Sequence, residues 1–177
     1  MQEKANIIDV FEGTFEPLYK YVYRRTNDEN FVKEILREAY LKLDELSEID
    51  KDKAMLVCYQ FAYSVIKNRN LFSMQESFWQ NLEEDEAEVL RLRFLEELST
   101  FDIAFVLQEQ AGKLDAFLYA TLMKAQEFFP GLADRKYVGA YFADVSSHFR
   151  KLKEEEVILI PEALKIELAG ELFNQTY

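Results

Sequence analysis

The sequence predicts an all-α protein made of two small helical domains and a mostly helical C-terminal extension. Apolar residues recur at spacings of three, four and seven along most of the 177 residues, and no alternating strand pattern of useful length is present. Five glycines and three prolines, none of them in a tract, argue against disorder and against a turn-rich β fold. The expected boundaries are a first domain at 1–72, a linker at 73–81, a second domain at 82–129 and an extension at 130–177.

The first domain begins with an apolar pattern over residues 5–25 that two helix breakers interrupt. Gly13 and Pro17 lie inside this pattern. Proline is tolerated in the first turn of a helix, where its missing N–H has no helical partner to lose. We therefore expect a short helix that ends near Gly13, followed by a second helix from Glu16 to Arg25.

Two longer helices complete the first domain. Asn27 or Asp28 can cap a helix at about 29–46 that has a wide apolar face. The next helix, at about 53–71, is apolar most of the way round, which predicts a central position in the domain. It holds the single cysteine, Cys58, for which we expect a buried and unreactive thiol.

The second domain, 82–129, shows three helical patterns separated by short breaks. The second pattern opens at Ser99, whose side chain can accept from the backbone N–H of Asp102, while Asp102 can reach back to Ser99. The third begins near Lys113, and Pro130 stops it. A helix, a break, a second helix and a longer third helix form the arrangement of a helix-turn-helix unit.

The extension at 130–177 adds further helical patterns. A helix is expected over 133–153, and the acidic run at 154–156 is expected to form a solvated turn. A short apolar stretch of extended type then leads to Pro161, which favours the start of a last helix at 162–173. An extension this apolar must cover other parts of the chain or a partner.

The charge of the chain is unfavourable for nucleic-acid binding. Its formal net charge is −12, whereas Lys and Arg contacts to phosphate usually supply most of the affinity for DNA. The excess is concentrated in the helix-turn-helix unit, because residues 82–129 hold 4 basic and 11 acidic groups, a net charge of −7.

Two stretches resemble bacterial sigma factors of the sigma-70 family, in its extracytoplasmic-function branch. Residues 89–99, VLRLRFLEELS, followed by Asp102-Ile103-Ala104, resemble the promoter-reading domain of that branch. Residues 32–43, VKEILREAYLKL, align without a gap on the helix that binds the polymerase clamp in the family. The resemblance implies a sigma region 2-like helical bundle followed by a sigma region 4-like helix-turn-helix domain, and it ends at Pro130.

The resemblance also implies contact residues in the first domain. Carried over residue by residue, the candidates for contact with RNA polymerase are Glu34, Arg37 and Glu38. The candidates for stacking on unpaired promoter bases and holding the DNA backbone are Tyr63, Lys67, Asn68 and Arg69. The alternative for this second group is that Tyr63 packs inside the domain while the basic residues form a solvated helix end.

The recognition helix departs from the family pattern where DNA would be read. The family usually has Val-Lys-Ser-Arg-Leu, whereas the gap-free register of this chain has LDAFL at 114–118 and a later register has LYATL at 118–122. Neither register offers an Arg, although bases are read by basic and polar side chains. The remaining candidates for DNA contact are Lys113, Tyr119, Thr121 and Lys124.

Several kinds of chemistry are not expected. One histidine, His148, and one cysteine are too few for a zinc site, a Cys–His nucleophile pair or an intramolecular disulfide. The acidic clusters at 83–88 and 96–97 are expected to form solvated helix faces. No signal-peptide pattern is visible, and no apolar run approaches the roughly 18 residues that a membrane helix needs. We therefore expect a cytoplasmic protein without enzymatic activity, cofactor, small-molecule substrate or membrane partner.

Three functions remain open. The favoured hypothesis is a sigma-like transcription regulator that acts through protein contacts, with core RNA polymerase or an anti-sigma protein as its partner, more than through promoter reading. The alternatives are a working sigma factor that binds polymerase and promoter DNA, and a helical scaffold or oligomerising protein. An excess of aromatic residues in the second domain favours protein partners, unless residues 130–177 cover them; these are Phe101, Phe105, Phe117, Tyr119, Phe128 and Phe129.

Overall fold

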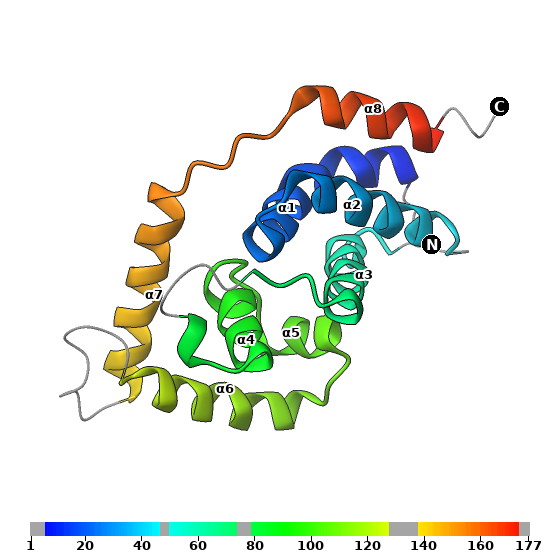
Figure 1. Ribbon diagram of the computed structural model, residues 1–177. Helices are drawn as coiled ribbons and strands as arrows, with labels where there is room; N and C mark the ends of the chain where they lie inside the picture. The colour runs from blue at the N-terminus through cyan, green and yellow to red at the C-terminus, as the bar shows by residue number, and fades with distance from the viewer. Residues whose placement is uncertain (1–5, 47–49, 74–78, 128–137, 174–177) are drawn as a thin grey trace. The chain divides into compact units, whose positions relative to one another are not determined.

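A computed structural model describes residues 6–46, 50–73, 79–127 and 138–173 of the chain (Figure 1). Within these ranges the regular structure comprises eight α-helices and one short 3-10 helix, without a strand, so the all-α prediction is confirmed. The chain divides into two compact units. Unit 1 is formed by residues 1–73 and 158–177, and unit 2 by residues 74–157. The expected extension at 130–177 is therefore shared between the two units.

The first helix of unit 1, α1 (Ile7–Thr26), is continuous, so the prediction of two helices was wrong. Pro17 lies inside α1, where a proline costs a hydrogen bond to the carbonyl of Gly13 and about 3 kcal/mol. The buried face continues on both sides of it, with Phe11 and Leu18 at 0% exposure. Burying each large apolar side chain contributes about 1.5–3 kcal/mol, so packing along the whole face outweighs the defect at Pro17.

The helices α2 (Glu29–Asp44) and α3 (Ala54–Arg69) pack on α1 and on each other to form a three-helix bundle. The predicted cap is confirmed at Asp28, whose carboxylate accepts from the backbone N–H of Asn30 at 2.8 Å. Cys58 lies at 0% exposure on α3. The buried hydroxyls of Thr14 and Tyr40 lie 3.0 Å apart within hydrogen-bonding distance, which joins α1 to α2 in the same core.

A fourth helix of unit 1, α8 (Glu162–Phe173), comes from the end of the chain and packs on α2 (Figure 1). It begins after Pro161 as the sequence predicts, and the Pro161 carbonyl accepts from the backbone N–H of Leu164 at 3.0 Å. Leu168 is its fully buried residue. At its end, the ring of Phe173 meets the edge of the Phe11 ring of α1, with centroids 5.4 Å apart.

Unit 2 begins with a short 3-10 helix, η1 (Trp79–Asn81), and then three α-helices in contact with one another. These are α4 (Glu84–Phe94), α5 (Thr100–Leu107) and α6 (Ala111–Ala125). The predicted Ser99 cap of α5 is confirmed, since the Ser99 hydroxyl accepts from the backbone N–H of Asp102 at 3.2 Å. The Asp102 carboxylate accepts from the Ser99 hydroxyl at 2.7 Å, whereas the sequence predicts the backbone N–H of Ser99 as its donor. Gln108, with a φ of 57°, closes α5.

The start of α6 differs slightly from the prediction. Ala111 and Gly112 belong to its first turn, whereas the sequence predicts them in the break before Lys113. The carbonyl of Gln110 accepts from the backbone N–H of Leu114 at 3.1 Å, so hydrogen bonding begins the helix earlier. The helical propensity of Ala111 offsets part of the cost of Gly112.

The last helix of unit 2, α7 (Val138–Glu155), packs on α4. Phe142 and Phe149 of α7 lie against Phe94 of α4, with ring centroids 5.2 Å and 5.4 Å away. The expected solvated turn at 154–156 was wrong for its first two residues, which continue α7. The predicted helix start at 133 and the aromatic residues Phe128 and Phe129 lie outside the described residues.

Candidate functional site

The three candidates for polymerase contact share one face of α2. Glu34, Arg37 and Glu38 are spaced three and four residues apart, which places them on the same side of a helix. Each of them forms an ion pair within unit 1. Arg37 Nε lies 3.3 Å from a carboxylate oxygen of Glu171 on α8, and Glu34 and Glu38 both pair with Arg69 on α3.

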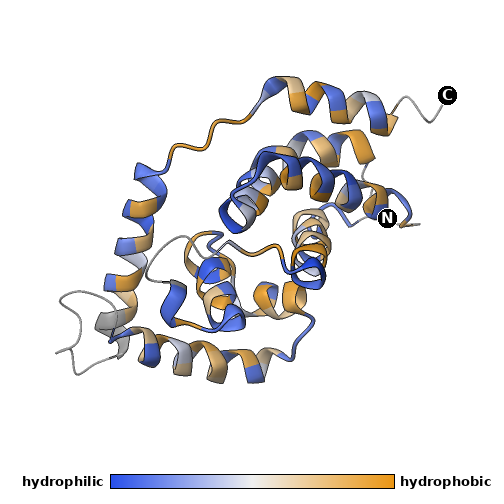
Figure 2. Ribbon diagram, in the orientation of Figure 1, coloured by the Kyte–Doolittle hydropathy of each residue, from blue (hydrophilic) through white to orange (hydrophobic). Residues whose placement is uncertain are grey.

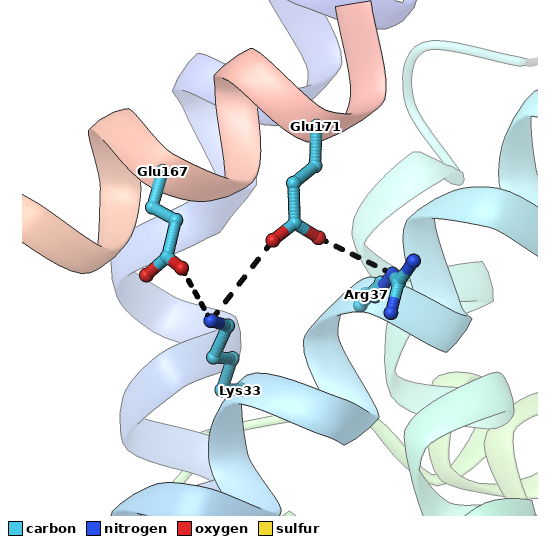
Figure 3. Close-up of polar contacts among 4 residues, drawn as sticks. All are labelled: Lys33, Arg37, Glu167 and Glu171. Carbon is cyan, nitrogen blue, oxygen red and sulfur yellow. Dashed lines mark hydrogen bonds and ion pairs between the residues drawn. The ribbon is translucent and has the colours of Figure 1, made fainter. Parts of the chain in front are cut away.

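Helix α8 covers part of this α2 face through charged side chains (Figure 3). Lys33 Nζ donates to Glu167 at 2.6 Å and lies 4.0 Å from Glu171. The hydrogen bond to Glu167 raises the pKa of Lys33, since it favours the charged ammonium. The contacts place two cations of α2, four residues apart, opposite two carboxylates of α8 that are also four residues apart.

A further ion pair joins α8 to α1. Lys165 Nζ lies 2.5 Å from a carboxylate oxygen of Glu12, and this hydrogen bond raises the pKa of Lys165. Here the lysine belongs to α8 and the carboxylate to the bundle, the reverse of the arrangement on α2. The two contacts of opposite polarity therefore join α8 to both α1 and α2.

The candidates for promoter contact lie in the second half of α3. Tyr63 packs inside unit 1, and Arg69 forms ion pairs there. Tyr63 is 8% exposed and its ring lies 6.3 Å from that of Phe72, so the packing alternative holds for Tyr63. Lys67 Nζ lies 5.5 Å from the centre of the Tyr63 ring. Arg69 pairs with α2 as described above, whereas Asn68 is exposed, with its side chain 3.5 Å from the Ser64 hydroxyl.

The candidates for DNA contact on α6 are divided between solvent and core. Lys113 and Tyr119 are exposed. Thr121 is 2% exposed, so it belongs to the core of unit 2 and its candidacy for DNA contact is corrected. Lys124 Nζ lies 2.7 Å from a carboxylate oxygen of Glu86 on α4. This ion pair leaves the Lys124 ammonium less available to bind a phosphate.

Both α5 and α6 expose large apolar side chains, most of them aromatic. We call these side chains the α5–α6 aromatic surface; they are Phe101 (76% exposed), Phe105 (37%), Phe117 (37%), Tyr119 (53%) and Met123 (42%). Within unit 2 the described helix of the extension, α7, packs on α4. The expectation that residues 130–177 cover these side chains stays a prediction, since Phe128 and Phe129 lie outside the described residues. Figure 2 shows the apolar colouring of α5.

Sequence reasoning missed a buried ion pair in α4. Glu88, predicted on a solvated face, is 0% exposed, and Arg91 is 2% exposed. Their side chains lie 3.7 Å apart, three residues along one helix. The available signal was their position between apolar neighbours on both sides, Ala87 and Val89 for Glu88. The pair lies in the core and serves packing, since it has no exposed side chain with which to bind a ligand.

The described ranges offer neither a membrane-spanning helix nor a metal-binding cluster. No helix in them has both the length and the apolar character needed to cross a membrane. Nor do three or more His, Cys, Asp or Glu side chains gather there in a group suited to a metal ion. Burial raises the pKa of the Cys58 thiol to about 12, so the thiolate is not formed at neutral pH.

No protein-family model, curated protein or solved structure matches this chain.

Proposed function

We propose that this protein is a sigma-like transcription regulator that acts through protein contacts, with core RNA polymerase or an anti-sigma protein as its partner. The proposal rests on the resemblance of two stretches of the sequence and on the chemistry of the surface of unit 2. In the proposed function, promoter reading contributes little or nothing.

The observation that carries the proposal is the α5–α6 aromatic surface. In a helix-turn-helix protein that reads DNA, the exposed side of the second helix presents basic and polar side chains to the major groove. Here α6, the helix in that position, exposes Phe117 and Tyr119 beside Lys113, and the preceding helix α5 exposes Phe101. Aromatic residues of this kind are enriched at protein–protein interfaces. Large exposed apolar patches are rare unless they bind something.

The charge of unit 2 supports the same proposal. Residues 82–129 carry a net charge of −7, and one of their four basic groups, Arg91, is buried while another, Lys124, pairs with Glu86. A surface with so few available cations repels phosphate, and phosphate contacts provide most of the affinity for DNA. A protein partner needs no such cations.

Two measurements on the full chain test this proposal. The first is binding to duplex and bubble DNA at low salt, where we expect no binding, because low salt maximises the electrostatic term and that term is repulsive here. The second is purification of the tagged chain from its own cell, where we expect polymerase subunits or an anti-sigma protein to accompany it.

Each alternative function has its own outcome in these measurements. Tight binding to bubble DNA would contradict the proposal and favour a working sigma factor. Recovery of the chain in complex only with copies of itself would also contradict the proposal, and it would favour a helical scaffold. Both measurements use the wild-type sequence, so neither depends on the folding of a variant.

A further inference from the structure

Helix α8 occupies a face of unit 1 that has the chemistry of a helix-binding site. We call it the α8-binding face and define it by Phe11 and Glu12 of α1 and by Lys33 and Arg37 of α2. Phe173 of α8 meets Phe11 at its apolar end. Lys33 and Arg37 meet the two carboxylates of α8 at 2.6 Å and 3.3 Å (Figure 3).

The attachment of α8 to this face is weak for a helix of its length. Among its 12 residues, Leu168 alone is fully buried, and Ile166 remains 71% exposed. The charged side chains that hold it keep 29% to 58% of their exposure. Ion pairs of this kind contribute about 0–1 kcal/mol each, and salt screens them. Salt can therefore weaken the ion pairs that hold the helix, while Leu168 and Phe173 supply its apolar contacts.

The segment that leads into α8 is also weakly attached. Val157 and Leu159 are 83% and 80% exposed, and no regular structure holds residues 156–160. Figure 2 shows this segment as an apolar stretch between α7 and α8. Exposed apolar residues of this kind do not anchor the helix, so α8 is held by its own contacts, with Leu168 and Phe173 as their apolar part.

The sequence of α8 shows which chemistry the face selects. It presents Glu167 and Glu171, four residues apart, beside an apolar stripe that includes Leu164 and Leu168. An amphipathic helix that lays its apolar stripe in a groove is a common mode of protein recognition, and its specificity comes from the charges at the rim. The rim charges here are Lys33 and Arg37, which meet the two carboxylates, and Glu12, which meets Lys165, so the face selects a helix that carries paired carboxylates on its α2 side.

We propose that the α8-binding face is a docking site for an acidic amphipathic helix of a partner protein, and that α8 is its displaceable intramolecular occupant. The inference deepens the proposed function, because Arg37, a candidate for polymerase contact, lies in the face. The occupied and open forms then differ in the access of a partner to α2. A covalently attached helix has an effective concentration on the order of millimolar, so a partner must compete against that value.

The test uses the full chain and a labelled synthetic peptide of residues 158–173 as the probe for an acidic helix. In the variant E167K/E171K, the carboxylates that pair with α2 become cations, so α8 is repelled from the face. We expect the peptide to bind this variant about tenfold or more tightly than it binds the wild type, in which the attached α8 competes. Fluorescence anisotropy measures both affinities.

The matched control is E127K/E154K. It alters the net charge by the same amount at two exposed glutamates of unit 2 and leaves α8 unchanged. We expect its affinity for the peptide to equal that of the wild type. An equal gain in the control would show a general charge effect and would overturn the inference.

A reversal of specificity tests the role of the rim charges. In the variant K33E/R37E the face becomes acidic, so the wild-type peptide should not bind and a peptide that carries E167K and E171K should bind. Binding of both peptides with equal affinity would mean that the ion pairs do not select the helix, which contradicts the proposal.

Amide hydrogen exchange supplies a readout that needs no partner. We expect exchange in α8 to quicken from about 0.05 M to about 0.5 M salt while exchange in α3 stays slow, because salt screens the exposed ion pairs. If α8 stays as protected as α3 in E167K/E171K, or if the peptide binds neither chain, then α8 is a fixed part of the fold and the inference fails. If the molecular mass of E167K/E171K in solution equals that of a dimer, a second copy of the chain occupies the α8-binding face. That result would also overturn the inference.

The outcome separates this inference from the proposed function. Peptide binding and amide exchange involve no transcription protein, so they can succeed while the purified chain brings neither polymerase nor an anti-sigma protein. Conversely, a partner that binds the α5–α6 aromatic surface with equal affinity in the wild type and in E167K/E171K would support the proposed function and leave α8 without a role in it.

Discussion

Cys58 shows how burial controls the chemistry of a single residue in this fold. Its side chain is 0% exposed, and desolvation raises the pKa of the thiol from about 9 to about 12. The same burial raises the pKa of the Tyr40 hydroxyl. Both groups are acids whose charged form is disfavoured by the folded state. Their titration therefore couples to stability at alkaline pH.

We predict that the free energy of unfolding decreases as pH rises above about 9. In that range the unfolded chain loses the Cys58 proton while the folded chain keeps it, so deprotonation favours unfolding up to the folded pKa of about 12. Urea unfolding at a series of pH values measures the effect, and Cys58→Ala should flatten the pH dependence. A wild-type stability that does not change between pH 9 and 11 would contradict this account.

The buried pair of Glu88 and Arg91 predicts a large effect of a single substitution. Removing one member leaves the other charge in the core, which costs about 3–5 kcal/mol. We therefore expect Arg91→Ala to destabilise unit 2 by about that amount. The double variant E88L/R91M, which removes both charges, should be much closer to the wild type. Urea unfolding followed by circular dichroism distinguishes the two, and equal losses in both variants would be inconsistent with a charge penalty.

At the scale of elements, the sequence was a good guide where a local signal and the packing agree. The caps at Asp28 and Ser99 and the start of α8 after Pro161 follow from local hydrogen bonding and backbone geometry, and the structure confirms them. The interruption of α1 at Gly13 and Pro17 was predicted wrongly. Its local signal was correct, but the continuous buried face of the bundle outweighs it, and burial is a property of the whole unit.

The positions of α7 and α8 could not be predicted from the sequence. Both patterns are amphipathic, and periodicity does not indicate which helix will cover which face. The contacts that decide the position of α8 join residues far apart in the chain, such as Glu12 with Lys165 and Arg37 with Glu171. The sequence predicted candidate contact residues on α2 and α3. It did not predict the ion pairs between these helices, because the partners are far apart in the chain.

Gly13 permits a test of the continuous α1. A Cβ at this position would meet no atom within 4 Å, and its residue is exposed. Glycine in the middle of a helix is less favourable than alanine by roughly 0.5–1 kcal/mol, so we expect Gly13→Ala to stabilise unit 1 by about that amount. Thermal unfolding measures the change. If α1 were broken at this point, the substitution would have no effect or would destabilise the unit.

Ser99→Ala tests the cap that begins α5. The loss of the hydroxyl removes the acceptor for the backbone N–H of Asp102 and the donor to its carboxylate. Loss of such a cap typically costs about 1 kcal/mol, and Ser99→Asp should retain most of the stability because aspartate also caps helices well. Chemical unfolding of unit 2 compares the two variants. An equal loss in both would show that side-chain size, and not capping, is the cause.

At the scale of the whole molecule, charge and exposed apolar surface favour proteins over DNA as partners. The net charge is −12, and the helix-turn-helix region that would read DNA carries Phe101 and Phe117 on its exposed side. The sequence predicted the excess of acid and the excess of aromatic residues. It could not predict which of these aromatic side chains are exposed within unit 2, because exposure depends on the tertiary packing of that unit.

The most direct test of the central claim compares partner capture by the wild type and by F101A/F117A, with the exposed Phe31→Ala of α2 as a control. All three tagged chains are purified from their own cell and the polymerase subunits or anti-sigma protein are quantified. We expect F101A/F117A to remain folded and to lose at least about tenfold of the partner, as truncated aromatic hot spots do, while Phe31→Ala keeps it. Equal capture by F101A/F117A and the wild type would contradict the claim that unit 2 acts through its aromatic surface.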